Sequence, residues 1–178
     1  MAEISCGSVT LNSFSRDCSP NMGGVKKVWM ILKSEVDATA ADGAISAITA
    51  SGDFHQFPFR KGAASFTSNL QKDDTAGSYY WQTDLVMNFQ RMETKKRVAV
   101  MALTQAECAA IVQDNNDKYW FLGFDEYLGA TAGTGETGTA KTDANQYTVT
   151  LQDNSLELPY EIPESVITGL NLPEVPEN

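Results

Sequence analysis

The stretch that decides the fold is YYWQTDLVMNFQ, residues 79–90. Large apolar or aromatic side chains occupy its odd positions, apart from Thr83, and mostly polar side chains occupy the even positions. An alternation of period two over residues 79–89 predicts one long β-strand with a buried face and a solvent-facing face. At about 3.3 Å per residue, this strand would span roughly 36 Å. A slip of one residue would expose the whole buried face, so the register is firmly specified.

Other strand patterns lie on both sides of this stretch. Residues 64–71 alternate in the same way, and residues 72–78, which include Gly77, form a hairpin loop between the two strands. A hairpin this long is not stable alone, so it must lie on the protein's own barrel or reach across to a neighbour. The further predicted strands cover residues 25–32, 44–50, 107–112, 119–122, 147–152 and 156–162, with an edge strand around Phe54, Phe57 and Phe59.

The remaining segments are predicted to be one helix, turns and loops. Residues 92–103 predict a helix whose broad apolar side holds Val98, Met101, Ala102 and Leu103, with a strand over 97–103 as the alternative. Residues 129–145 are rich in Gly, Ala and Thr and predict a mobile loop. Asp153-Asn154-Ser155 predicts a turn between the last two strands. Four of the six prolines fall in the last 20 residues, which predicts an extended C-terminal arm.

Length, charge and cysteine content limit the classes of protein. A chain of 178 residues fits one domain with a proper core. A net charge of −10 is the wrong sign for gripping phosphates. Cys6, Cys18 and Cys108 form no CxxC pair, so we expect reduced thiols, with a Cys6–Cys18 cross-link as the alternative. We expect no signal peptide and no membrane span.

Several motifs resemble functional sites, but a structural role is favoured for each. Residues 133–138 spell GxGxxG, yet a small-residue loop precedes them and a strand follows, so a flexible loop is favoured over a nucleotide site. Residues 114–117 (DNND) lack the spacing of a calcium loop and predict a hairpin turn. His55, the single histidine, lies among phenylalanines and is expected to be packed or half-exposed rather than catalytic. We therefore expect no enzyme, no catalytic residue, no cofactor and no metal.

The distribution of charge favours an assembly surface. Residues 91–97 (RMETKKR) carry a net charge of +3, which leaves −13 on the rest of the chain. Cations at a helix N-terminus oppose the helix dipole, so an acidic surface on an identical neighbour is expected to compensate them, in a head-to-tail contact that forms rings or stacks. A solvated helix face is the alternative. The expected assembly interface comprises Arg91, Lys95, Lys96, Arg97, Asp73 and Asp74.

Three quoted segments support a resemblance to a known family. They are RDCSPNMGGVK at residues 16–26, YWFLG at residues 119–123 and QYTVTLQDNSLELPYEI at residues 146–162. Together with the order of hairpin, helix, strand, Asp-Asn-Asn turn and Gly-Thr-rich segment, they resemble the major tail tube proteins of tailed bacteriophages and related prophages. The resemblance covers roughly residues 16–162.

The resemblance implies a fold and a function. The fold would be a mainly β structure, a β-barrel or sandwich with a long hairpin and one flanking α-helix, also seen in type VI secretion tube proteins. It would comprise an N-terminal arm (residues 1–24), the barrel domain (25–162) and a C-terminal arm (163–178).

Six copies would form a ring, and rings would stack into a virion tail tube, assembled in the host cytoplasm. DNA would pass through this tube without specific binding. The partners would be further copies of the chain and other tail or neck proteins, with no membrane. The alternatives are a neck or tail-completion protein of similar fold, and a carbohydrate-binding β-sandwich that uses Trp81 and Trp120.

Overall fold

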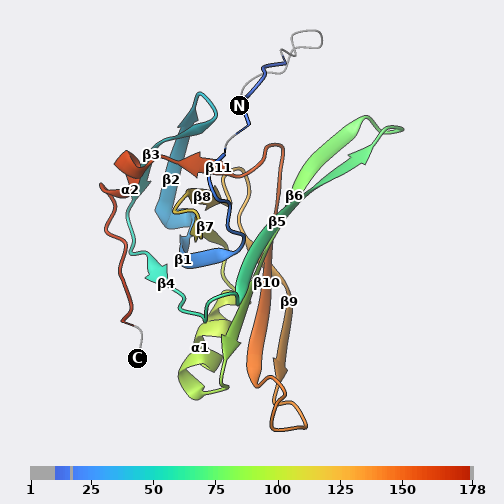
Figure 1. Ribbon diagram of the computed structural model, residues 1–178, viewed down its shortest axis with the longest axis vertical. Helices are drawn as coiled ribbons and strands as arrows, with labels where there is room; N and C mark the ends of the chain where they lie inside the picture. Colours follow the sequence, from blue (N-terminus) through green and yellow to red (C-terminus); the bar gives the residue numbers. More distant parts are fainter. Residues whose placement is uncertain (1–10, 17, 177–178) are drawn as a thin grey trace.

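The computed structural model describes residues 11–16 and 18–176. Its strands form a seven-stranded sheet, here called sheet A, and a four-stranded sheet, here called sheet B. The two sheets pack against each other, and the principal helix lies beside one end of sheet B (Figure 1). The predicted mainly β fold is therefore confirmed.

Sheet A has the strand order β2-β3-β11-β8-β7-β1-β4, and all its pairings are antiparallel except β3 with β11. Its strands are β1 (Val25–Leu32), β2 (Val36–Ala41), β3 (Ala44–Ala50), β4 (His55–Gln56), β7 (Cys108–Asp114), β8 (Tyr119–Leu122) and β11 (Tyr160–Ile162). A 3-10 turn, Lys33–Glu35, joins β1 to β2.

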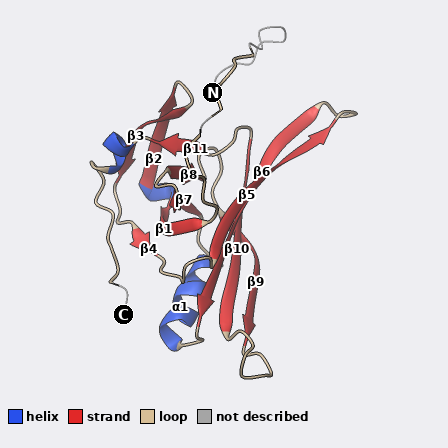
Figure 2. Cartoon of the chain, viewed as in Figure 1, coloured by secondary structure: helices blue, strands red, loops and turns tan. Residues whose placement is uncertain are grey.

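Sheet B is antiparallel throughout, with the order β5-β6-β10-β9. Its strands are β5 (Ala64–Asp73), β6 (Ser78–Gln90), β9 (Gly129–Glu136) and β10 (Gln146–Ser155). The helices are α1 (Thr94–Leu103) and the short α2 (Glu164–Ile167), shown in blue in Figure 2.

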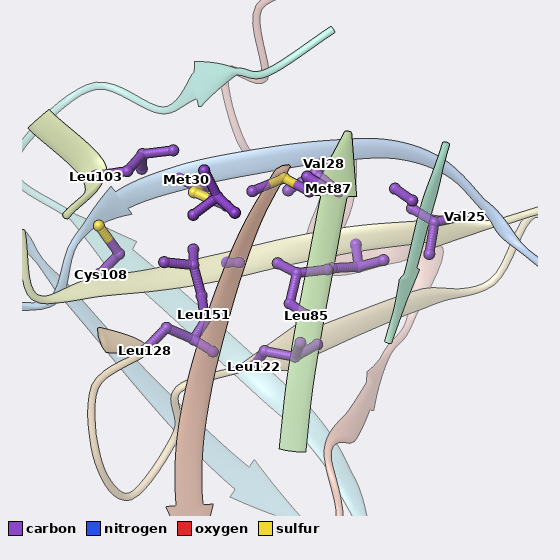
Figure 3. Packing of buried hydrophobic residues seen from close by; sticks show 14 of the residues in the cluster. Val25, Val28, Met30, Leu85, Met87, Leu103, Cys108, Leu122, Leu128 and Leu151 are labelled. Carbon is purple, nitrogen blue, oxygen red and sulfur yellow. The ribbon is translucent and has the colours of Figure 1, made fainter. Parts of the chain in front are cut away.

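Two apolar clusters hold these layers together. The first fills the space between the sheets, where Met30 and Cys108 of sheet A meet Leu85, Met87 and Leu151 of sheet B (Figure 3). The second lies on the other face of sheet A. It includes residues from both ends of that sheet, so sheet A curls around it. Its buried members are Trp29, Ile31, Val36, Ile45, Phe54, Ala109, Ile111, Phe121 and Ile162.

The long strand follows the predicted pattern in its second half. Thr83, Leu85, Met87 and Phe89 are buried toward sheet A, and the residues between them are only half-buried. The first three residues of β6 are exposed, because together with the end of β5 they extend beyond the body of the protein (Figure 1).

Three predictions for the second half of the chain are corrected by the structure. Residues 129–136 are not part of a loop: they form β9, which pairs with β10 along its length. The expected turn at 153–155 is also absent, because β10 continues through Ser155 and buries both Asp153 and Ser155. Only Tyr160–Ile162 of the last predicted strand is a strand, and it pairs with β8 and β3 rather than with β10.

The helix exists, but its predicted apolar side does not face the core. α1 is helical from Thr94 to Leu103, which rules out the strand alternative. Leu103 alone in α1 is buried; Val98 is 58% exposed, Met101 is 48% exposed and Ala102 is also exposed. The edge strand predicted around residues 54–59 is likewise reduced to the two residues of β4.

Both ends of the described chain contact the body. Residues 11–16 and 18–24 have no helix or strand, but the backbone of Met22 and Gly23 is hydrogen-bonded to the side chains of Asn116 and Asn115. After α2, the carbonyl of Pro173 accepts a hydrogen bond from the indole of Trp29. The predicted C-terminal arm thus contains a short helix and returns to sheet A.

Two of the cysteines can be placed. Cys18 is exposed and Cys108 is buried, and both are free thiols. Burial raises the pKa of the Cys108 thiol. Cys6, the other partner of the possible cross-link, lies outside the described residues.

Candidate assembly interface

The tip of the β5–β6 hairpin projects from the body of the protein (Figure 2). Leu70, Tyr79 and Tyr80 near this tip are 48%, 43% and 41% exposed. A two-stranded ribbon gains little stability without a covered face. Its exposed Leu and Tyr side chains are therefore available for contact with another surface.

The two predicted acidic residues of the tip serve the turn itself. One carboxylate oxygen of Asp73 accepts hydrogen bonds from the N–H groups of Thr75 and Ala76, at 2.8 and 3.2 Å. Asp74 forms a 2.6 Å ion pair with Lys72. Both acids thus have local partners within the turn.

The predicted cations gather at the other end of β6. Arg91 follows the strand directly, with a φ of 64° that is uncommon for a residue with a side chain. Asn145 fixes this bend by accepting hydrogen bonds from the N–H groups of Arg91 and Met92. Lys95, Lys96 and Arg97 lie in the first turn of α1.

One of these cations is compensated within the chain. Lys96 forms a 3.0 Å ion pair with Glu93 and donates to the carbonyl of Gln90 at 2.7 Å. This hydrogen-bonded pair lowers the pKa of Glu93. Lys96 therefore has partners within its own chain, and its place in an intermolecular contact stays a prediction. Arg91, Lys95 and Arg97 form no salt bridge with any residue in the described part of the chain.

The structure separates the predicted acidic and basic residues instead of bringing them together. Asp73 ends β5 and Asp74 lies in the turn that leads into β6, whereas the cations follow the end of β6, which is 13 residues long. At about 3.3 Å per residue the two groups are roughly 40 Å apart. They lie at opposite ends of the protein (Figure 1), so they could meet only between copies.

Sheet B has two open edges. β5 and β9 are the outer strands, and among the described residues each pairs with a neighbour on one side only. β9 consists of small residues, and six of its eight positions are exposed. An exposed, regular edge presents unpaired N–H and C=O groups that can pair with a strand of another chain.

The face of sheet B that points away from sheet A is polar and has no cation. The register places on this face Ser65, Thr67, Asn69, Gln71 and Asp73 of β5, Tyr80, Gln82, Asp84, Val86, Asn88 and Gln90 of β6, Gln146, Thr148, Thr150, Gln152 and Asn154 of β10, and Ala132, Thr134 and Glu136 of β9. The charged members are all acidic. Hydrogen bonds along the face include Thr148 to Asn88 at 2.8 Å and Gln82 to Asp84 at 3.1 Å.

A buried carboxylate links the two sheets behind this face. Asp153 of β10 is 4% exposed, and its Oδ2 accepts a 2.7 Å hydrogen bond from the N–H of Gly123, which follows β8. Its Oδ1 has no partner among the described residues. Burial raises the pKa of Asp153 to about 6 in spite of that hydrogen bond. The burial of Asp153 was not predicted from the sequence, because residues 153–155 were expected to form a turn.

The other candidate residues take part in strands, a turn and side-chain packing. Gly133, Gly135 and Glu136 of the GxGxxG segment lie in β9, so the predicted flexible loop is corrected to a strand. Asp114 accepts hydrogen bonds from the N–H groups of Asn116 and Lys118 and forms the predicted turn. Trp120 donates to Asp114 and packs against Phe66, so it is not an open platform for a sugar.

Two findings concern metals and membranes. In the part of the chain that the structure describes, no three His, Cys, Asp or Glu side chains are grouped to hold a metal ion. No helix among the described residues has the length and apolar character needed to cross a membrane.

Comparison with known proteins adds no assignment. No family model, no curated protein and no solved structure matches this chain.

Proposed function

We propose that this protein is the subunit of a self-assembling tube, the tail tube of a tailed bacteriophage, through which DNA passes. The observation that carries the proposal is sheet B, which combines two open edges with a cation-free polar face. The sequence resemblance to major tail tube proteins supports the same function.

The open edges supply the ring contact. If β5 of one copy pairs with β9 of the next, the four-stranded sheets join into one continuous barrel wall, and the edge N–H and C=O groups are all paired. Six copies, as the resemblance implies, would close such a wall. Sheet A and α1 would then lie on the outside of it.

The cation-free face supplies the channel wall. DNA binds proteins mainly through its phosphates, which lysine and arginine neutralise. A wall of amides and hydroxyls with Asp84 and Glu136 offers the phosphates no cationic partner. DNA would therefore slide along this wall without being held.

A pair of proline substitutions in β9 tests the ring contact. Gly133 and Thr134 are consecutive, so the N–H of one faces β10 and the N–H of the other faces the open edge. Proline where the N–H faces outward keeps the β9–β10 ladder and blocks pairing with a neighbour. The other proline breaks a ladder hydrogen bond and destabilises the fold.

The readouts are the unfolding midpoint and the solution mass, measured for Gly133→Pro and Thr134→Pro beside the unsubstituted protein. We expect one variant to keep its unfolding midpoint and yet lose assembly. If the variant with the unchanged midpoint assembles normally, β9 does not form the ring contact.

A further inference from the structure

A groove of about 480 Å³ is lined by the turn joining β2 to β3, by Tyr79 near the tip of the projecting hairpin, and by residues that follow β8 and β10. Its lining includes Asp42, Tyr79, Asp125, Leu156 and Glu157. This volume is in the range of pockets that hold a small ligand, so it accepts a few side chains and not a whole helix.

The groove is both acidic and apolar. Asp42, Asp125 and Glu157 contribute three carboxylates, the lining contains no lysine or arginine, and none of these acids forms a salt bridge with a described residue. Leu156 and Tyr79 are 52% and 43% exposed there. The groove therefore suits a partner that presents cations around an apolar centre.

The outward face of α1 has this composition. At 3.6 residues per turn, Val98 and Met101 lie side by side on the helix, opposite the buried Leu103. The same geometry places Lys95 on one flank of this apolar pair and Arg97 on the other. Val98 and Met101 are 58% and 48% exposed, and neither flanking cation has a salt bridge within the described chain.

The helix cannot reach the groove of its own chain. Tyr79 lies at the start of β6, and α1 follows the end of β6, roughly 40 Å away along the strand. Figure 1 shows α1 and the β2–β3 turn at opposite ends of the molecule. A contact between them must therefore join two copies, head to tail.

We infer that the outward face of α1 docks into this groove of the next copy, with Lys95 and Arg97 against the three carboxylates and Val98 and Met101 against Leu156 and Tyr79. The inference rests on the proposed self-assembly and identifies its second contact. β5 and β9 would join copies within a ring, and this contact would join one ring to the next. It assigns the acidic partner to the groove instead of to Asp73 and Asp74.

Charge exchange tests this contact. The helix variant is Lys95→Glu/Arg97→Glu, and the groove variant is Asp125→Lys/Glu157→Lys. At a given protein concentration, the fraction of protein in stacks should be at least tenfold lower for each variant, measured by sedimentation velocity and electron microscopy. Their equimolar mixture should recover stacks, because an acidic helix then meets a basic groove and a basic helix meets an acidic groove. Lys61→Glu/Lys141→Glu makes the same charge change at other exposed lysines and should stack normally.

The outcomes separate the two proposals. If the unsubstituted protein stacks and the helix variant stacks equally well, the docking is wrong and the tube function stands. If the helix variant and the groove variant both fold and both lose stacking, but their mixture does not recover it, the pairing of helix with groove is also wrong. If the unsubstituted protein forms no rings or stacks, the proposed function fails and the docking fails with it.

Discussion

Replacing Asp153 by Asn probes the buried contact between the two sheets. Asn keeps an oxygen that can accept the hydrogen bond from Gly123 and removes the negative charge. The pKa of Asp153 rises from 3.8 to about 6 on folding, because burial disfavours the ionised form and the nearby Asp125 and Glu126 add repulsion. The native state therefore holds this proton more tightly than the unfolded chain does.

The sign and the size of the effect follow from this shift. Between about pH 4 and pH 6 the native state binds more protons at Asp153 than the unfolded state, so its contribution to the free energy of unfolding falls as pH rises. A shift of about two pKa units corresponds to about 3 kcal/mol. Asp153→Asn removes this loss, so the variant should gain up to about 3 kcal/mol relative to the unsubstituted protein between pH 4 and pH 6.5. Above that range the difference should stay constant.

Urea unfolding at several pH values measures this difference. Both proteins are compared at concentrations where the solution mass is that of a monomer. Asp84→Asn makes the same substitution on the outward face of β6 and controls for the loss of one negative charge. A difference between variant and parent that stays flat from pH 4 to pH 7, or that falls with pH, would refute the account of Asp153.

Two further predictions concern packing and backbone conformation. Met87→Ala should lower the free energy of unfolding by about 2–5 kcal/mol, because Met87 is fully buried between the sheets, whereas Val86→Ala on the outward face should cost less than about 1 kcal/mol; equal losses in urea unfolding would contradict the face assignment. Gly123→Ala should cost about 2–5 kcal/mol, because φ is 82° and a Cβ would lie 3.1 Å from the carbonyl oxygen of Cys108. Gly43→Ala, at a φ of 80° with open space around it, should cost about 1–2 kcal/mol, and a cost as large as that of Gly123→Ala would show that the close contact is unimportant.

The sequence predicted elements whose pattern arises from burial on one face. The alternation in β6 is clear because its odd-numbered residues from Thr83 to Phe89 are buried against sheet A. β1 could be predicted for a related reason: its second half is buried on both faces and is continuously apolar. Burial produces an apolar pattern within the strand's own sequence, so these strands can be predicted without knowing which strands they pair with.

β9 could not be predicted, because its structure depends on a neighbour. Glycine, alanine and threonine in this segment leave no apolar pattern, and glycine weakens a strand. What makes it a strand is the backbone ladder with β10, a contact between segments that are separate in the sequence. The turn predicted at Asp153-Asn154-Ser155 was wrong because these residues prefer turns locally, whereas their pairing with β6 keeps them in a strand.

The assembly interface expected from the sequence stays a prediction. The charge count located the basic segment, and Arg91, Lys95 and Arg97 have no salt bridge with any residue that the structure describes. The pairing of Lys96 with Glu93 and the carbonyl of Gln90 could not be predicted, because it depends on the bend at Arg91. The groove was beyond prediction, since its lining comes from four separate parts of the chain.

The central claim is that copies of this chain join through sheet B into rings that stack as a tube. Negative-stain electron microscopy over a concentration series, with the solution mass measured in parallel, tests it most directly. The account predicts particles with a central hole, rings at low concentration and tubes at high concentration, with masses that are multiples of 19.4 kDa. A single species of 19.4 kDa at every concentration, without rings or tubes, would contradict it.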